Sequence, residues 1–269
     1  MKAIIISLLA ILLAAVLIIG NIEWRKNHSS LSSHQKTNSE TETTNTNKNS
    51  NNSKTASSNS IPVENYIAHA DAWPKSAKKQ FEIKLQDKKS FHIVLLGSQS
   101  IGDEKTGLLP IIKEKLADTY DKYVTIESIV YDDTSANFIE NGEVTNLVNK
   151  KPDMILFEPF TLNDNNIIDM NQSVINVKTI MDATKQELPD VTFILQPPNQ
   201  IEHATIYPLQ VRALKTYAEE NQISYLNHWE NWPAGDSSKI EDYINKDDTP
   251  NEKGYEVWGD YINQFLVKE

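Results

Sequence analysis

Cysteine is absent from this 269-residue chain. No disulfide can cross-link it, and no thiol can serve as a nucleophile or a metal ligand. Basic residues are fewer than acidic ones, which gives a formal net charge of -11. A charge of that sign argues against nucleic acid as a partner and against adhesion to anionic lipid head groups. A Gly-x-Gly-x-x-Gly turn is also missing, which disfavours nucleotide or flavin binding.

Residues 1–26 contain one long apolar run. The run spans Ala3–Ile19, and the basic pair Arg25 and Lys26 follows shortly after it. Its length is close to that needed to cross a bilayer as a helix. No convincing small-x-small cleavage motif follows the run, as an exported and cleaved signal would require. We interpret residues 1–26 as an uncleaved membrane anchor and keep a cleaved signal peptide as the alternative.

Residues 27–62 form a polar segment between this run and the rest of the chain. About two-thirds of the residues from His28 to Ser60 are Ser, Thr or Asn, and apolar residues are almost missing. Such a composition cannot bury enough apolar surface to offset the entropy of ordering, so we expect a disordered linker. An anchor followed by such a linker is typical of proteins displayed outside a bacterial membrane. We therefore expect an extracytoplasmic folded domain over residues 63–269.

Short apolar runs alternate with amphipathic ones along residues 63–269. The alternation predicts βαβ units, and hence a three-layer, doubly wound α/β sandwich with a five-stranded parallel sheet of flavodoxin-like type. A helix over 63–85 precedes the first strand, and Pro74 is expected to begin its second segment. The predicted strands are 91–96, 124–131, 154–157, 191–195 and 224–226. The predicted helices between them are 108–120, 136–148, 172–187 and 208–220.

Ligands bind outside the carboxyl ends of the strands in sheets of this kind. Polar residues follow every predicted strand here, and there are more of them than turns alone require. We therefore expect the functional site at this edge. The segments concerned begin at Gly97, Asp132, Glu158, Gln196 and Asn227.

The loop and helix near the carboxyl terminus carry a partial motif. Thr249-Pro250-Asn251-Glu252-Lys253-Gly254 resembles the last sequence block of the SGNH/GDSL hydrolases, Asp-x-x-His-Pro-Asn-x-x-Gly. In that family the His is the general base of a serine esterase. Here Thr249 takes the His position and Lys246 the Asp position. The resemblance implies the family's fold but lacks part of its chemistry.

Two further blocks support the resemblance, which extends over the whole folded domain. Gly97-Ser98-Gln99-Ser100-Ile101 resembles the Gly-Asp-Ser-Leu block in two registers. Without a gap, Gly97 matches, Ser98 takes the Asp position and Gln99 the nucleophile position. A shift by one residue places Ser100-Ile101 on Ser-Leu but loses the glycine. Asn163-Asp164 resembles the Gly-x-Asn-Asp block, whose Asn donates a hydrogen bond to the oxyanion. The resemblance therefore implies Ser98 or Ser100 as nucleophile and Asn163 as oxyanion donor. Substrate contacts are expected from Gly97, Gln99, Asp164 and Trp229.

A serine ester hydrolase needs a general base within about 3 Å of its nucleophilic hydroxyl. The partial motif of this chain does not supply that base. His228 follows the fifth strand and is our candidate, and His203 is a second possibility in the loop after the fourth strand. Each residue also has a structural alternative. His228 can be a partly buried ring beside Trp229, His203 a solvated loop residue, and Ser98 a turn cap.

Two functions follow from these patterns. The favoured one is a membrane-anchored, extracytoplasmic hydrolase of SGNH/GDSL type with an altered active site, an esterase or deacylase acting on a glycan or lipid ester of the cell envelope. The alternative is a catalytically inactive module that binds or scaffolds in the envelope, because loss of a triad residue removes activity without disturbing the fold. No cofactor and no metal is expected.

Overall fold

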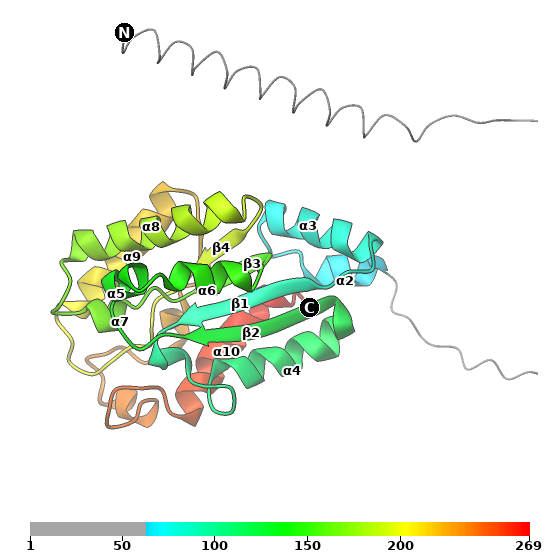
Figure 1. Cartoon of the computed structure of the whole chain (residues 1–269). Helices are drawn as coiled ribbons and strands as arrows, with labels where there is room; N and C mark the ends of the chain where they lie inside the picture. Colours follow the sequence, from blue (N-terminus) through cyan, green and yellow to red (C-terminus); the bar gives the residue numbers. More distant parts are fainter. Residues whose placement is uncertain (1–62) are drawn as a thin grey trace, which may run out of the picture. The chain divides into compact units, whose positions relative to one another are not determined.

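The structure is a computed structural model that describes residues 63–269 (Figure 1). The predicted membrane anchor, 1–26, and the predicted linker, 27–62, lie outside the described residues. None of the helices within 63–269 combines the length and the apolar character needed to cross a bilayer.

Five parallel strands form one sheet in the order β2-β1-β3-β4-β5. The central strand β1 pairs with β2 and β3, so that Ile93 lies opposite both Ile126 and Met154. The predicted fold class is confirmed, and each predicted strand lies within one residue of an observed one. The strands are β1 (Phe91–Gly97), β2 (Val124–Val130), β3 (Met154–Phe157), β4 (Thr192–Leu195) and β5 (Ser224–Tyr225).

The helices follow the predicted alternation with one correction. The single helix predicted over 136–148 is two helices, because the chain turns at Gly142, whose φ of 73° is a left-handed conformation that suits glycine. The predicted break at Pro74 is confirmed. The helices are α2 (Val63–His69), α3 (Lys75–Gln86), α4 (Leu108–Tyr120), α5 (Ser135–Glu140), α6 (Glu143–Asn149), α7 (Thr161–Asp164), α8 (Met170–Glu187), α9 (Tyr207–Glu220) and α10 (Glu252–Leu266). Short 3₁₀ turns are η1 (Gln99–Ile101), η2 (Asp121–Tyr123), η3 (His228–Asn231) and η4 (Ser238–Asp242).

Each face of the sheet has its own apolar core, because alternate side chains of a strand point to opposite faces. Ile93 and Leu95 of β1 pack with α2, α3, α4 and α10, whereas Val94 and Leu96 pack with α5, α6, α8 and α9. Figure 1 shows α4 and α10 on one side of the sheet and α5, α6, α8 and α9 on the other. Burial on both faces explains why the strands are apolar throughout.

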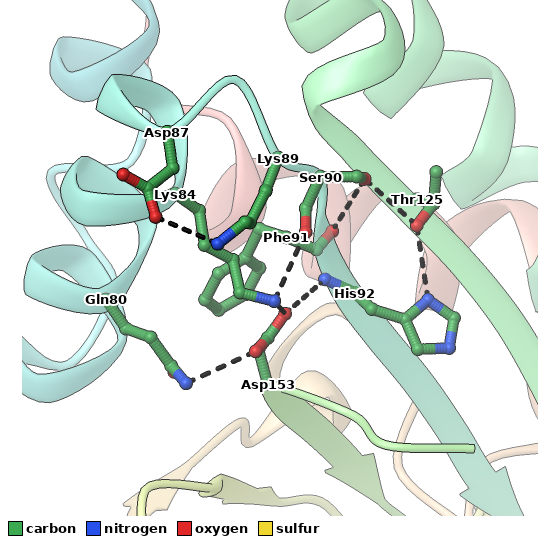
Figure 2. A network of polar contacts seen from close by, with 9 residues as sticks. All are labelled: Gln80, Lys84, Asp87, Lys89, Ser90, Phe91, His92, Thr125 and Asp153. Carbon is green, nitrogen blue, oxygen red and sulfur yellow. Dashed lines mark hydrogen bonds and ion pairs between the residues drawn. The ribbon is translucent and has the colours of Figure 1, made fainter.

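The amino-terminal edge of the sheet is held by a charged network (Figure 2). Asp153, which precedes β3 and is 5% exposed, accepts a hydrogen bond from the backbone N–H of His92 at 2.7 Å. It also pairs with Lys84 Nζ at 2.5 Å and accepts from Gln80 Nε2 at 3.2 Å. The network ties α3 to β1 and β3 at the edge opposite the predicted site, so its role is structural.

Candidate functional site

The carboxyl ends of β1 and β3 meet at the point where the strand order reverses, which is where ligands bind in such sheets. Glu158 follows β3 here and is fully buried. Its carboxylate accepts hydrogen bonds from the backbone N–H groups of Ser98 at 2.6 Å and Phe160 at 2.9 Å. Burial raises the pKa of Glu158 to about 7, although these hydrogen bonds act in the opposite direction. Glu158 therefore joins two strand exits from inside the fold.

The first strand exit turns its serines inward. Ser98 is fully buried, and its hydroxyl accepts a hydrogen bond from the backbone N–H of Ser100 at 3.2 Å, which caps η1. Ser100 is only 4% exposed. Gln99, between them, is exposed. The two predicted nucleophiles thus lie in the interior, and the residue that faces solvent at this exit is Gln99.

Gly97 has a packing reason to be glycine. A Cβ atom there would lie 2.7 Å from Ile101 Cγ2 and 3.0 Å from the Glu158 side chain. Distances this short exclude a side chain. Gly97 thus allows η1 and Glu158 to close over the end of β1.

The last loop carries Thr249 where the family has its base. Thr249 Oγ1 donates a hydrogen bond to Asp247 Oδ1 at 2.7 Å and accepts one from Asn245 Nδ2 at 3.1 Å. The bond from Thr249 lowers the pKa of Asp247. A hydroxyl does not accept a proton near neutral pH as an imidazole does. Thr249 therefore closes the loop and leaves the base position without a base.

The Pro-Asn-x-x-Gly part of the same block has a structural explanation. Asn251 caps α10 by accepting the backbone N–H of Gly254 at 3.2 Å, and its Nδ2 donates to the Asp242 carbonyl at 3.0 Å. A Cβ atom on Gly254 would approach the Tyr243 carbonyl oxygen to 2.3 Å, so only glycine fits there. These residues hold the loop against the start of α10.

One cavity of about 480 Å³ joins the first exit and the last loop. Both Gln99 and Thr249 line it, so the chain positions that resemble the family's nucleophile and base do face one space. Ser98 and Ser100 are not part of its wall. Among the described residues of the wall, none is Lys, Arg or His. The wall consists of Gln99, Gly102, Asp103, Thr106, Val130, Asn245, Thr249, Pro250, Asn251, Glu252 and Tyr255.

The chemistry of this wall is that of hydroxyls, amides and two carboxylates. Asp103 accepts hydrogen bonds from the backbone N–H groups of Thr106 and Lys105, both at 2.7 Å, and these bonds lower its pKa. Asp103 is therefore ionised at neutral pH, and Glu252 adds a second acidic group. Such a wall suits a ligand rich in hydroxyl groups and repels phosphate or carboxylate ligands.

Asn163 and Asp164 form a joint between neighbouring loops. Asn163 Nδ2 donates to the Asp133 carbonyl at 3.1 Å, which links α7 to the exit of β2. Asp164 is fully buried and accepts hydrogen bonds from Ser135 Oγ at 2.6 Å and Ser173 Oγ at 2.5 Å. Asp164 thus fixes α5 and α8 instead of facing a ligand. One N–H of Asn163 is engaged in the same joint.

The structure does not support His228 as the general base. The ring is fully buried and stacks on Trp258, with the ring centres 4.1 Å apart and the planes 9° from parallel. Its Nε2 donates to the Pro197 carbonyl at 2.8 Å, and within residues 63–269 it makes no hydrogen bond to either predicted serine. Burial lowers the pKa of His228 to about 3, so the ring is neutral. It is buried more completely than the partly buried ring of the structural alternative, and it stacks on Trp258 and not on Trp229.

Trp229 and His203 lie at a different hollow from Gln99. This second hollow, of about 470 Å³, also has Gln200 and Tyr207 in its wall. The Trp229 indole donates to the Pro198 carbonyl at 2.7 Å, and its ring packs against that of Tyr207. His203 is exposed and pairs with its neighbour Glu202 at 3.1 Å. The predicted site residues therefore divide among the cavity, a second hollow and the interior.

Sequence reasoning did not assign the greater part of the cavity wall. Asp103, Thr106, Asn245 and Tyr255 come from loops and a helix start whose positions depend on tertiary structure. Thr249 was visible only as a departure from a motif. Its spacing from Asn251 and Gly254 is the signal that locates the wall.

These features define the class of the domain, a wound parallel α/β fold with a cavity at the carboxyl edge. Comparison with solved structures identifies the class more closely. A GDSL-like lipase from Parabacteroides merdae is similar at a TM-score of 0.56 and 12% identity, over 66% of this chain and 96% of that one. A lipase/acylhydrolase from Enterococcus faecalis gives 0.52 and 17%, over 66% and 97%. The described domain therefore has the SGNH/GDSL hydrolase-like fold.

An acetylxylan esterase from Geobacillus stearothermophilus is similar to the same extent. Its TM-score is 0.52 and its identity 14%, over 66% of this chain and 95% of that one. No protein-family model matches the chain, and no curated protein matches it. Identities this low establish the fold and leave the activity to the residues of the cavity.

Proposed function

We propose that this domain is a binding module of SGNH/GDSL hydrolase-like fold that holds a hydroxyl-rich ligand, such as a cell-envelope glycan, without hydrolysing it by a Ser-His mechanism. The single observation that carries the proposal is that Gln99 and Thr249 face one cavity. They occupy the positions that the sequence resemblance assigns to the nucleophile and the base. A hydrolase with an altered site was the favoured hypothesis from sequence, and the interior positions of Ser98, Ser100 and His228 argue against it.

The rest of the proposal concerns where the module acts. Residues 1–26 are proposed to anchor the chain in the cell membrane, and residues 27–62 to separate the anchor from the domain. An extracytoplasmic domain on such a tether meets the glycans and lipids of the envelope. The acidic wall, with Asp103 and Glu252, favours neutral sugars over anionic polymers.

Ligand binding and turnover, measured on the same protein, test this function. Calorimetric titration with acetylated and unacetylated neutral oligosaccharides should detect binding, and hydrolysis of p-nitrophenyl acetate should not exceed the buffer rate. Gln99→Trp fills the cavity and should abolish binding. Gln86→Trp, at an exposed position at the end of α3, is the matched control and should bind normally.

Ester turnover that is lost in Ser98→Ala or Ser100→Ala would contradict the proposal and restore the hydrolase hypothesis. Binding that is unchanged in Gln99→Trp would also contradict it, because the ligand would then occupy another surface.

A further inference from the structure

The surface formed by α8 and α9 exposes an unusual number of large apolar side chains. Five of the seven exposed large hydrophobic residues of the described chain belong to these helices or to the turns just before them. Ile175 is 51% exposed and Leu209 is 47% exposed. The five residues are Ile167, Met170, Ile175, Ile206 and Leu209. Clusters of this kind on soluble domains mark interaction sites.

A hollow of about 590 Å³ runs between the two helices. Its wall on α9 repeats at helical spacing, so these side chains form one outward stripe along the helix. The stripe on α9 is Leu209, Arg212, Ala213, Thr216, Tyr217 and Glu220, and the wall on α8 is Met170, Asn171, Val174 and Ile175. We name these ten residues the α8–α9 face.

The composition of the α8–α9 face is that of a protein interface. Interfaces are enriched in aromatic residues, Met and Arg and depleted of Lys, Glu, Asp, Ser and Ala. Ala213 and Glu220 are the members of the face that depart from this pattern. The face contains Met170, Tyr217 and Arg212, and it contains no Lys or Asp. Arg212 is also the only arginine within residues 63–269.

The two charged residues of the face can pair with those of a second copy of the face. Arg212 and Glu220 lie eight residues apart on α9, a separation of about 12 Å along the axis. In the part of the chain that the structure describes, neither side chain has an ion-pair partner. A two-fold axis through Thr216, midway between them, would pair Arg212 of each copy with Glu220 of the other.

The inner side of α9 makes the face a rigid platform. Leu214 and Ala218 are buried in the apolar core on this face of the sheet, and Val211 is also buried. The face also lies on the opposite side of the sheet from α4 and α10 (Figure 1). The start of α10 forms part of the wall of the cavity that Gln99 and Thr249 line, which we call the rim cavity. Pairing through this face would leave that cavity open.

We propose that two copies of this chain form a two-fold symmetric dimer through the α8–α9 face, with the α9 helices antiparallel. A bilayer surface fits the face less well, because insertion would place Glu220 among lipids. A second copy fits the face because it supplies an opposite charge to both of the exposed side chains that are unpaired within residues 63–269, Arg212 and Glu220. This inference is independent of the ligand proposed for the cavity.

Because the chain has no cysteine, a single introduced thiol reports the arrangement directly. In the full-length protein, Thr216→Cys should form a disulfide with itself across the axis, since only residues close to the axis meet their own copies. Most of the protein should then migrate as a dimer on a non-reducing gel. Lys113→Cys, exposed on α4 at the other side of the sheet, is the matched control and should stay monomeric.

Charge exchange tests the pairing. In the Thr216→Cys background, Arg212→Glu alone or Glu220→Arg alone should reduce cross-linking at least fivefold, because like charges then oppose each other at both contacts. The two changes together should restore it. Circular dichroism of each variant identifies any loss of folding, and the restored double variant separates a charge effect from a folding effect.

The proposal is overturned if Thr216→Cys cross-links no more than Lys113→Cys, or if the charge changes have no effect on cross-linking. A cross-linked product whose mass is not twice that of the chain would show another protein at this face and would also overturn it.

Discussion

The two edges of the sheet treat buried polar groups differently. At the amino edge, the buried carboxylate of Asp153 is matched by a cation, Lys84, and by N–H donors (Figure 2). At the carboxyl edge, neither the buried Glu158 nor the buried His228 has an ion-pair partner within residues 63–269. Burial raises the pKa of Glu158 and lowers that of His228, which favours the neutral form of each side chain. The amino edge pairs its buried charge with a cation, whereas Glu158 and His228 at the carboxyl edge are buried without an opposite charge.

At the carboxyl edge, the residues of the motifs fall into two groups, those that pack the edge and those at catalytic positions. The positions that hold the rim together, such as Gly97, Asp164 and Gly254, keep the family's residue types and have packing or hydrogen-bonding reasons to do so. Gln99 and Thr249, at the positions that resemble the family's nucleophile and base, do not keep the family's residue types. A domain of this fold can lose its catalytic residues and keep the packing of its carboxyl edge, because different residues serve the two roles.

The largest expected effect comes from restoring the chemistry at the carboxyl edge. Gln99→Ser, Thr249→His and Lys246→Asp together would place a hydroxyl, a base and its orienting carboxylate around the existing cavity. A positioned base contributes roughly 10²–10⁴-fold to rate, so p-nitrophenyl acetate hydrolysis should rise by at least 10²-fold over the unmodified protein. The matched control carries Gln99→Ala with the other two changes. If both triple variants are equally slow, positions 99 and 249 do not line one cavity at a distance that lets a serine meet a histidine.

At the amino edge, Asp153→Ala should be the most destabilising single change. It leaves the backbone N–H of His92 and the ammonium of Lys84 without their buried partner. Removing one member of such a pair costs about 3–4 kcal/mol, near the low end because Lys84 can reach water. Urea denaturation measures the loss. Lys115→Ala, which removes the exposed pair with Glu269, should cost less than about 0.5 kcal/mol. Equal losses in the two variants would remove the distinction between buried and surface pairs.

His228 should make the carboxyl edge sensitive to acid. Its folded pKa, about 3, is below the ordinary value of 6.5, so its contribution to stability is present above pH 6.5 and is lost as the pH falls. His228→Phe keeps the stacking on Trp258 but removes the titration and the hydrogen bond to Pro197. Relative to the unmodified protein, the variant should gain about 3 kcal/mol of stability between pH 7 and pH 4. A difference in stability that does not depend on pH would show that His228 is not buried in its neutral form.

Glu158 should have the opposite dependence. Its folded pKa, about 7, is above the ordinary value of 4.5, so its contribution to stability is complete below pH 4.5 and is lost as the pH rises to 7. Glu158→Gln does not titrate. Relative to the unmodified protein, its free energy of unfolding should rise by about 2 kcal/mol between pH 5.5 and pH 8. Denaturation at both pH values provides the measurement, and a constant difference would place the Glu158 carboxyl in contact with water.

The sheet was predictable because each strand is a short apolar run bounded by polar turns, and burial on both faces leaves no other pattern for β1, β3 and β4. The break at Gly142 was missed because the apolar spacing continues across it. The direction of a side chain at a strand exit was not predictable. Whether Ser98 or Gln99 faces the cavity depends on the turn of η1, which Glu158 fixes from a distant segment. His228 reaches the correct edge but lies on the Trp258 ring, a contact that no local pattern indicates.

The most direct test of the central claim, that the rim cavity has no activated serine, is labelling of the unmodified protein with a fluorophosphonate probe, read by mass spectrometry of its peptides. No label is expected on Ser98 or Ser100, whereas position 99 should be strongly labelled in the triple variant that restores the triad. A stoichiometric label on Ser98 or Ser100 of the unmodified protein would show that one of these serines is activated.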